Sequence, residues 1–407
     1  MIIKSNQDCT RLSFFTALFI FRKGMDAVAK SAYFHIPFCA QICYYCDFNK
    51  VFFHGQPVDE YLQAMEKEMK RTMEAFPADR LDTLFVGGGT PTVLEMKQLD
   101  FFLQSIYKHF RFSAAEVEFT FEANPNELSK EKLQLLKEAG VNRLSFGVQT
   151  FDDALLKAIG RTHRYEDVIK TIALAKEIGF ENISIDLMYG LPRQTVAQFL
   201  TDLEIAFSLD VQHISAYSLI IEPKTVFYNL MRKGKLLLPS EEEEAKMYEE
   251  AMRQMEMHDY HQYEISNYAR PGFQSRHNLT YWNNEEYYGI GAGAHSYVGG
   301  VRRANVRPIK KYIAKVEETG FPYLEVHHVT KSEQMEEEMF LGLRKTEGVS
   351  KQRFFEKFGM SIPDVFGQAV AREKQKGLLE ETETHIRLTQ RGKLLGNEVF
   401  QAFIGGI

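Results

Sequence analysis

The chain has 407 residues, of which 44% are hydrophobic and 26% charged, and its formal net charge is −6 at pH 7. This length is too great for one ordinary core, so we expect a globular protein of two or three domains. The acidic balance gives no general reason to expect nucleic acid or an anionic membrane as a partner. Only four cysteines are present and three fall within eight residues, which excludes a disulfide framework and favours a reducing, cytoplasmic location.

An apolar segment, LSFFTALFIF at positions 12–21, lies near the start of the chain between basic residues. Ten residues are too few to span a bilayer, which takes about 20. A basic pair separates this segment from an Ala-Val-Ala sequence at 27–29 that resembles a signal-peptide cleavage site, and this order argues against export. We therefore expect residues 1–30 to be a non-essential extension, with Met25 opening the functional chain. Weak association with a membrane surface is the alternative.

From residue 31 the chain alternates short apolar segments with longer ones whose apolar residues recur at a period near 3.6. The short segments are rich in β-branched and aromatic residues and end at turn-forming or charged residues, which predicts strands. They lie at 32–36, 83–86, 116–121, 143–148, 183–187 and 213–218. Six strands alternating with helices predict a parallel α/β sheet with right-handed crossovers, either doubly wound or curved as a barrel.

Residues suited to chemistry gather where the predicted strands end. Three cysteines follow the first strand, a glycine triplet follows the second, and Glu122, Gln149 and Asp186 lie at the ends of the next three. Functional residues at the carboxyl ends of parallel strands are typical of TIM barrels. With six strands in place of eight, we expect a partial (β/α)6 TIM-type barrel over residues 31–235.

The pattern changes after about residue 235. Ser240 and the glutamates after it form a capping box that predicts a new helix, and loops and short strands follow, so we interpret 236–325 as a connecting region. Three helices and then a hairpin are predicted at 332–344, 350–358, 363–376 and 378–388. They predict a mostly helical, winged-helix-like domain over 326–407.

The motif Cys39-x3-Cys43-x2-Cys46 is the strongest signal in the sequence. Iron–sulfur clusters usually take four thiolate ligands, but the remaining cysteine, Cys9, lies in the doubtful extension. A [4Fe–4S] cluster held by three thiolates has one iron open to a further ligand. Zinc is the alternative; a structural zinc site takes four ligands, and the nearest other donor, His35, precedes the motif on a strand that ends in a proline.

The segment from Tyr33 to Phe48 reads YFHIPFCAQICYYCDF. It resembles the radical S-adenosylmethionine (SAM) signature of the coproporphyrinogen dehydrogenase family, and more narrowly its HemW branch of haem chaperones. The similarity extends over nearly the whole chain from about residue 31. It implies that the three cysteines hold a [4Fe–4S] cluster whose open iron binds SAM, and that an electron from the cluster can cleave SAM to a 5′-deoxyadenosyl radical.

The resemblance also implies which residues contact SAM. The glycine triplet matches the motif for the SAM amino group, and Tyr45 matches a residue that packs near the adenine. The full set is Tyr33, Tyr45, Gly88, Gly89, Thr90, Glu122, Gln149, Arg161 and Asp186. Taken singly, the glycine triplet has a tight turn as its alternative role, and each of Glu122, Gln149, Arg161 and Asp186 has a structural hydrogen bond or salt bridge.

A second motif, His277-Asn278-x2-Tyr281-Trp282, contains the only tryptophan of the chain. One interpretation is an amphipathic turn that packs its aromatic rings against the barrel. Imidazole is also a common axial ligand of haem iron. The motif is similar to the haem-associated H-N-x-x-Y-W of HemW proteins, which implies that His277 binds the iron and that Asn278, Tyr281 and Trp282 contact haem.

Two weaker candidates for haem contact lie nearby. His295 is an alternative iron ligand. A basic cluster could meet the haem propionates or form only a solvated face. Its members are Arg302, Arg303, Arg307, Lys310 and Lys311.

One difference from the signature of the coproporphyrinogen dehydrogenases distinguishes between two functions within the family. Coproporphyrinogen dehydrogenases continue the cysteine loop as Cys-x-Cys, whereas Phe48 stands at that position here. This favours a haem chaperone that binds cluster, SAM and haem and transfers haem to an acceptor protein, with an electron donor as a further partner. The alternative is an oxygen-independent coproporphyrinogen III dehydrogenase, so enzymatic activity stays open. A nucleic-acid-modifying enzyme is disfavoured because the terminal domain lacks a basic stripe.

Overall fold

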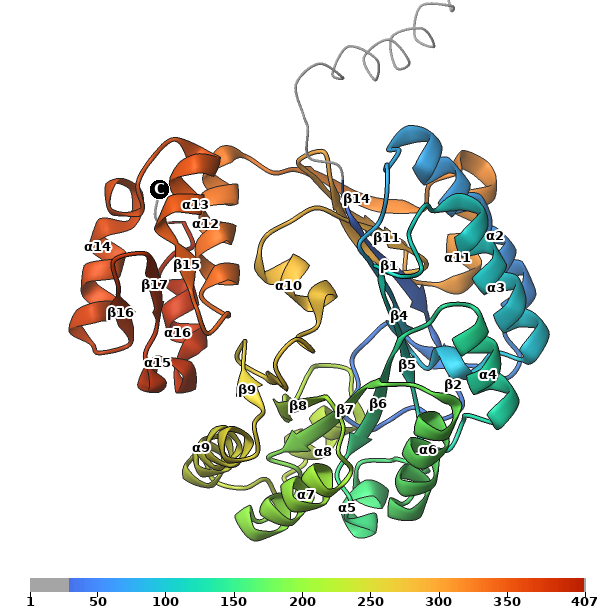
Figure 1. The fold of residues 1–407 in the computed structure, drawn as a ribbon, viewed down its shortest axis with the longest axis horizontal. Helices are drawn as coiled ribbons and strands as arrows, with labels where there is room; N and C mark the ends of the chain where they lie inside the picture. Colours follow the sequence, from blue (N-terminus) through green and yellow to red (C-terminus); the bar gives the residue numbers. More distant parts are fainter. Residues whose placement is uncertain (1–28, 406–407) are drawn as a thin grey trace, which may run out of the picture.

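The computed structural model describes residues 29–405. Cys9 and most of the expected N-terminal extension lie outside the described residues. The described chain forms one 12-stranded sheet with helices along its outer face, and a C-terminal domain with a three-stranded sheet (Figure 1). No helix within 29–405 is both long and apolar enough to cross a membrane.

The six predicted strands are all present and occupy the middle of the large sheet. They are β1 (Ser31–Ile36), β4 (Thr83–Gly88), β5 (Glu118–Ala123), β6 (Arg143–Gln149), β7 (Asn182–Tyr189) and β8 (His213–Ser218). Neighbours in this order pair in parallel, so their carboxyl ends meet at one edge. The expected partial (β/α)6 barrel is confirmed.

Helices connect these strands and cover the outside of the sheet (Figure 1). They are α2 (Val58–Ala75), α3 (Met96–His109), α4 (Lys130–Glu138), α5 (Asp153–Ala158), α6 (Tyr165–Ile178), α7 (Val196–Ser208) and α8 (Val226–Arg232). The predicted apolar stripe of α2 is buried, including Tyr61, Met65 and Met69. After β1, the short strands β2 (Phe38–Cys39) and β3 (Val51–Phe52) pair in parallel and close the cysteine loop.

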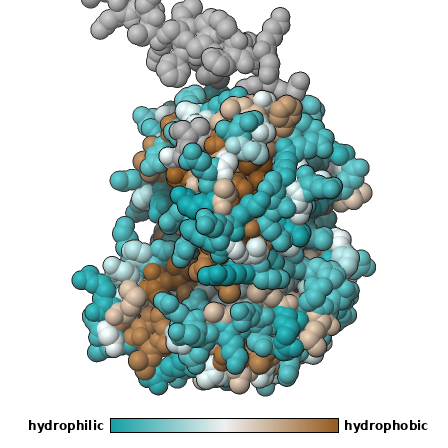
Figure 2. Space-filling view, turned by 90° about the vertical axis from the view of Figure 1, so that its left-hand side faces the viewer, coloured by the Kyte–Doolittle hydropathy of each residue, from teal (hydrophilic) through white to brown (hydrophobic). Residues whose placement is uncertain are grey.

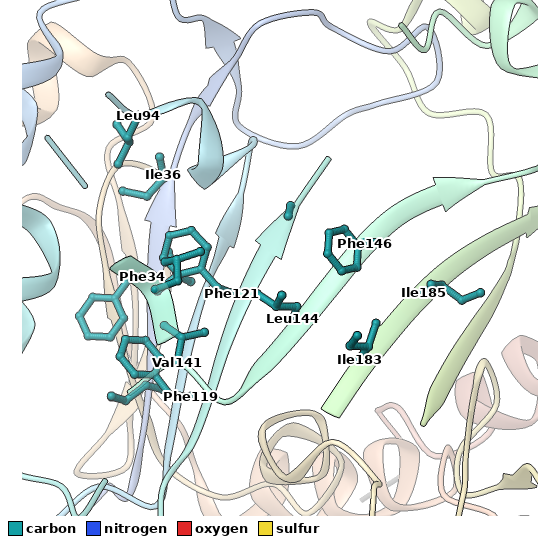
Figure 3. Packing of buried hydrophobic residues seen from close by; sticks show 14 of the residues in the cluster. Phe34, Ile36, Leu94, Phe119, Phe121, Val141, Leu144, Phe146, Ile183 and Ile185 are labelled. Carbon is teal, nitrogen blue, oxygen red and sulfur yellow. The ribbon is translucent and has the colours of Figure 1, made fainter. Parts of the chain in front are cut away.

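Alternation along the parallel strands separates two kinds of side chain. Phe34, Phe121 and Phe146 lie on the outer face and belong to the main hydrophobic core under the helices (Figure 3). The opposite face, inside the barrel, carries polar side chains such as Glu122 and Ser145. The apolar face therefore stabilises the fold, and the polar face is free to form a site.

Residues 236–325, expected as a connecting region, extend the sheet at both edges. They form α9 (Glu241–Met257), β9 (His261–Gln262), β10 (Asn267–Ala269), α10 (Arg276–Trp282), β11 (Tyr287–Ile290), β12 (His295–Val298), β13 (Val301–Asn305), α11 (Ile309–Thr319) and β14 (Tyr323–His328). β10 pairs antiparallel with β8, whereas β11 pairs in parallel with β1 at the other side. The segment between them, which includes α10, crosses the inner face of the sheet (Figure 1).

The C-terminal domain contains the three predicted helices and the predicted hairpin. They are α12 (Lys331–Gly342), α13 (Lys351–Phe358), α14 (Ile362–Gln375), β16 (Leu379–Glu381) and β17 (His385–Leu388). The strand β15 (Val349–Ser350) and two short helices, α15 (Gln390–Leu394) and α16 (Gly396–Gln401), were not predicted. The domain has its own core, which includes Met339, Phe354 and Ile386. Figure 2, which faces this side of the molecule, shows separate apolar patches on a mainly polar surface.

Candidate cofactor site at the carboxyl ends of the strands

The cysteine loop is held in place by backbone hydrogen bonds. The amide of Cys46 donates to the carbonyl of Cys43 at 3.3 Å. The amide of Tyr44 donates to Ile159 O at 3.0 Å, and Tyr44 O accepts from the amide of Phe227 at the same distance. These bonds anchor the loop to the end of α5 and to the first turn of α8, so the thiols keep a defined position at the mouth of the barrel.

Polar side chains reach two of the three thiols. The Thr90 hydroxyl donates to Cys39 Sγ at 3.8 Å, and Arg161 Nη1 donates to Cys43 Sγ at 3.5 Å. Burial raises the pKa of Cys39 to about 12 and also raises the pKa of Cys46. Metal ligation requires the thiolate form. Buried thiols of this kind ionise only beside a positive partner, and the irons of a cluster supply one.

A single zinc ion fits these residues less well than a cluster does. No three His, Cys, Asp or Glu side chains in the described part of the chain converge on a point that could hold one metal ion. His35 is also unavailable because its Nδ1 meets the Tyr33 hydroxyl and its Nε2 meets Asn49 O, both at 2.8 Å. In a cluster each thiolate binds a different iron, so convergence on one point is not needed.

A pocket opens beside the cysteine loop at the carboxyl ends of the parallel strands. It is lined by all three cysteines and by eight of the nine residues predicted to contact SAM. Those eight are Tyr45, Gly88, Gly89, Thr90, Glu122, Gln149, Arg161 and Asp186. The ninth, Tyr33, does not line this pocket; burial and the charge of Glu122 raise its pKa well above the usual value. The fold thus brings together eight of the nine residues for which the resemblance implies a contact with SAM.

The glycines of the triplet are required by the protein itself. Gly88 has φ +111°, and a Cβ at this position would lie 2.3 Å from the ring of His35. A Cβ at Gly89 would lie 2.7 Å from the carbonyl oxygen of Phe38. Any larger residue would therefore displace the strand that carries the cysteine loop, whether or not a ligand is bound.

The amides of residues 88–90 already donate to Glu122, Ile36 and Phe38, at 2.7–3.0 Å. The backbone of this segment can therefore offer a ligand only its carbonyl oxygens, which are acceptors. An ammonium group needs acceptors of this kind. The geometry thus agrees with the role in binding the SAM amino group that the resemblance implies.

Two half-buried carboxylates face the same pocket. Burial, and in second place the charge of Asp186, raise the pKa of Glu122 to about 7. Burial also raises the pKa of Asp186, whose Oδ1 accepts from the Ser215 hydroxyl at 2.8 Å. Two acidic groups that disfavour each other's ionisation form a site at which a cation is stabilised. SAM carries positive charge on its ammonium and sulfonium groups, so the residues fit it.

Arg161 connects the cluster loop to the strand ends. Its Nη2 donates to Asn124 Oδ1 at 2.7 Å and to Gly147 O. Asn124 in turn donates to Thr90 Oγ1 at 3.0 Å. Asn124, Gly147 and Ser145 line the pocket but were not predicted. Each lies two or four residues from Glu122 or Gln149 in the sequence, and side chains at such spacings in a strand point to the same face. This alternation is the sequence pattern that could have revealed them.

The H-N-x-x-Y-W motif occupies a different position, on α10 at the inner face of the sheet. Ser275 caps this helix by accepting from the amide of Asn278 at 3.3 Å. The Glu118 carboxylate accepts from the amides of Arg276 and His277 at 2.9 and 3.0 Å. A carboxylate at a helix N-terminus is stabilising, so Glu118 fixes α10 against β5.

His277 is only 1% exposed, and both of its ring nitrogens are occupied. Nδ1 lies 2.7 Å from Thr83 Oγ1, and Nε2 lies 2.8 Å from the Tyr281 hydroxyl. The ring stacks on Phe85 with centroids 5.1 Å apart. Burial lowers the pKa of His277 to about 3, so the imidazole is neutral, as a metal ligand must be. In this arrangement it presents no free nitrogen.

The end of α10 contacts the C-terminal domain. The guanidinium carbon of Arg344 lies 4.5 Å from the centre of the Trp282 ring, and Trp282 Nε1 is buried without an acceptor among residues 29–405. Asn283, the next residue, accepts from Lys345 Nζ at 2.8 Å and from Arg353 Nη2. The motif therefore joins the barrel to the C-terminal domain.

The weaker haem-contact candidates differ in their surroundings. His295 is exposed. Arg302 forms a paired contact with Glu337, at 2.8 Å from both Nε and Nη2, and Arg303 lies over the ring of Phe76. Both arginines therefore have partners already, whereas the basic residues between positions 307 and 311 are exposed.

Comparisons with known proteins agree with this geometry. The family model of the radical SAM superfamily matches residues 33–206, and that of the HemN C-terminal domain matches 329–395. The solved structure of coproporphyrinogen III oxidase (HemN) from Escherichia coli, described as a radical SAM enzyme, superimposes with a TM-score of 0.84 at 25% identity. That match covers 97% of this chain and 94% of HemN.

Curated relatives are more similar in sequence. The Heme chaperone HemW of Bacillus subtilis (strain 168) is 58% identical, over 92% of this chain and 99% of that protein. The Heme chaperone HemW of Escherichia coli (strain K12) is 33% identical, over 92% and 98%. The resemblance noted in the cysteine segment is thereby confirmed over almost the entire length, and the chain belongs to the HemW family of the radical SAM superfamily.

Proposed function

We propose that this protein is a haem chaperone that binds a [4Fe–4S] cluster and SAM and transfers haem to an acceptor protein. The observation that carries the proposal is the combination of a cluster loop with Phe48 in place of a further cysteine. Phe48 is 65% exposed and lines the rim of the cysteine pocket, next to Cys46 and Lys50. Relatives that align over nearly the full chain bear the name of haem chaperones.

Cys39, Cys43 and Cys46 are the residues that we assign to the cluster. When bound, the cluster would supply the electron for reductive cleavage of SAM. Around it, Arg161 positions the loop, and Glu122 and Asp186 supply negative charge for the cationic end of SAM. The electron donor and the haem acceptor are partners of unspecified identity, and the expected location is the cytoplasm.

We propose that His277 is the ligand of the haem iron, provided that one of its ring nitrogens becomes free. Because Thr83 and Tyr281 occupy its two nitrogens, His277 can bind iron only after one of these hydrogen bonds is exchanged for the metal. Displacement of α10 from the inner face of the sheet achieves this exchange. His295, which is exposed, is the alternative ligand that requires no displacement.

Haem titration of anaerobically reconstituted protein tests the proposal, with coproporphyrinogen III, SAM and a reductant supplied in a parallel reaction. We expect about one haem per chain and no SAM-dependent formation of protoporphyrinogen. His277→Ala should shift the haem absorption band and leave the cluster intact, whereas His295→Ala should not shift the band. Protoporphyrinogen formation together with haem binding that is indifferent to His277 would establish the dehydrogenase instead.

A further inference from the structure

Arg143, the first residue of β6, is a buried guanidinium with no carboxylate in direct contact. The residue is 2% exposed and forms no salt bridge within residues 29–405, although its positive charge partly offsets the rise that burial causes in the pKa of the more distant Asp186. Its Nη1 donates to two neutral oxygens, Asn182 Oδ1 at 2.9 Å and Phe273 O at 3.5 Å. Buried charges are normally paired because desolvation without a counter-ion is costly. A buried arginine without a direct ion pair can take a further anion at close range.

A polar cavity of about 150 Å³ lies beside Arg143 inside the barrel. Four serine hydroxyls line it, from Ser145, Ser184, Ser215 and Ser275. Asn278 of α10 also lines it, and the side-chain amide of Asn278 has no hydrogen-bond partner in the described part of the chain. A cavity of this volume holds a molecule about the size of benzene. It can therefore admit a short carboxylate arm but not a porphyrin ring.

The positive and negative side chains that line the cavity lie at different levels along the strands. Arg143 is opposite Thr120 and Asn182, so it lies two residues before the level of Glu122 and four before that of Asp186. At about 3.3 Å per residue these steps correspond to roughly 7 and 13 Å along the strands. Glu122 and Asp186 also line the cofactor pocket, so the cavity is negative where it meets that pocket and positive at its far end.

We propose that the Arg143 end of this cavity binds the carboxylate of a propionate arm of a tetrapyrrole, whose ring stays outside the cavity. Arg143 supplies the charge, and the side-chain amide of Asn278, which also lines the cavity, supplies a further donor. The inference rests on the proposed function because it takes haem as the ligand. Under this inference, Asn278 of the H-N-x-x-Y-W motif recognises the propionate carboxylate, whereas His277 binds the haem iron.

Binding of haem and of haem dimethyl ester to wild-type protein and to Arg143→Gln tests this inference. In wild-type protein the ester should bind about 10-fold or more weakly than haem, the effect of losing a hydrogen bond to a charged group. In Arg143→Gln the two ligands should bind equally weakly. Arg270→Gln is the matched control, because Arg270 is also partly buried but is paired with Asp210 outside the cavity, and it should keep the wild-type preference.

Metal-free coproporphyrin III, followed by its fluorescence, separates this inference from the chaperone proposal because it has carboxylate arms but no iron. Arg143-dependent binding of coproporphyrin III without haem binding would support the subsite and remove the chaperone function. The inference is overturned if Arg143→Gln still binds haem dimethyl ester more weakly than haem. It is also overturned if wild-type protein binds neither haem nor coproporphyrin III. Should Arg143→Gln fail to fold, Arg143→Lys and Asn278→Ala provide the same comparison, with a smaller loss expected for each.

Discussion

The cysteine loop and α10 each carry a motif with an assigned ligand, but the fold holds the two motifs in opposite ways. At the cysteine loop the assigned side chains line an open pocket, and two carboxylates there disfavour each other's charge. At α10 the assigned ligand His277 is buried, and protein hydroxyls satisfy both of its nitrogens. A cofactor can therefore enter the first region directly, whereas the proposed ligation of haem by His277 requires the second region to open.

The largest effect should come from the thiols of the cysteine loop. Cys43→Ala should remove nearly all of the roughly four irons and four sulfides expected per chain, since one lost thiolate leaves too few ligands. Iron and sulfide analysis after anaerobic reconstitution measures this. Cys9→Ala is the matched control and should retain full content. Equal loss in both variants would show that the cluster has four protein ligands and no open iron.

We call α10 closed when His277 is hydrogen-bonded to Thr83 and Tyr281 at the inner face of the sheet. In this closed state His277 should stabilise the fold even without haem. His277→Ala should lower the free energy of unfolding by about 2–4 kcal/mol, because it leaves the buried hydroxyls of Thr83 and Tyr281 without their partner. Denaturant titration of haem-free protein checks this value. The exposed His295 is the control, and His295→Ala should change stability by less than about 0.5 kcal/mol. Equal, small changes would mean that α10 is not closed in solution.

The raised pKa of Glu122 in the open pocket should make the stability of the protein depend on pH. The pKa of Glu122 is raised from 4.5 to about 7, so folding favours its neutral form. The stability this contributes is complete below about pH 4.5 and is lost as the pH rises through 7. Glu122→Gln should therefore reduce the loss of stability of SAM-free protein between pH 5 and pH 8 by about 1–3 kcal/mol, measured by denaturant titration.

Glu68 is a matched control for this experiment, because burial also raises its pKa to about 7 although it lies outside the pocket. Glu68→Gln should reduce the pH dependence similarly and leave SAM affinity unchanged. Glu122→Gln should weaken SAM binding by cluster-loaded protein. If both variants weaken SAM binding equally, Glu122 has no specific role in the site.

A smaller effect is expected where α10 meets the C-terminal domain. Arg344→Gln removes the cation–π contact with Trp282 and should lower stability by about 0.5–2 kcal/mol. Amide hydrogen exchange should become faster at residues 283–285, which follow α10. Arg253→Gln, on the exposed side of α9, should change neither quantity. Unchanged exchange in Arg344→Gln would show that the domain does not hold α10 closed.

The smallest change should come from Phe48, whose side chain is mostly exposed. Phe48→Cys should alter stability by less than about 0.5 kcal/mol. We expect it to leave coproporphyrinogen III unreacted in the presence of SAM and a reductant, because a single thiol does not rebuild a substrate site. Assay of protoporphyrinogen is the measurement. Its appearance would show that Phe48 alone separates the two functions.

Local sequence patterns were enough to predict the barrel and, together with the family resemblance, most of the cofactor pocket. Strand alternation and the position of each polar residue at a strand end are local features, and parallel pairing then brings those ends together for geometric reasons. Glu122 and Asp186 could be placed at one edge of the sheet in this way, and they do line one pocket. The spacing of the cysteines is likewise a property of a single loop.

Tertiary structure decided the features that depend on contacts between distant segments. His277 and Thr83 are 194 residues apart in the chain, so no local pattern could reveal that the imidazole is already satisfied. The strands on both edges of the sheet are only two to six residues long, and the two that join the parallel strands, β11 and β10, pair with segments far away in sequence. In the sequence Arg143 is an ordinary strand residue. Only the fold buries it beside a cavity without a direct ion pair, because burial and charge pairing are properties of the packed molecule.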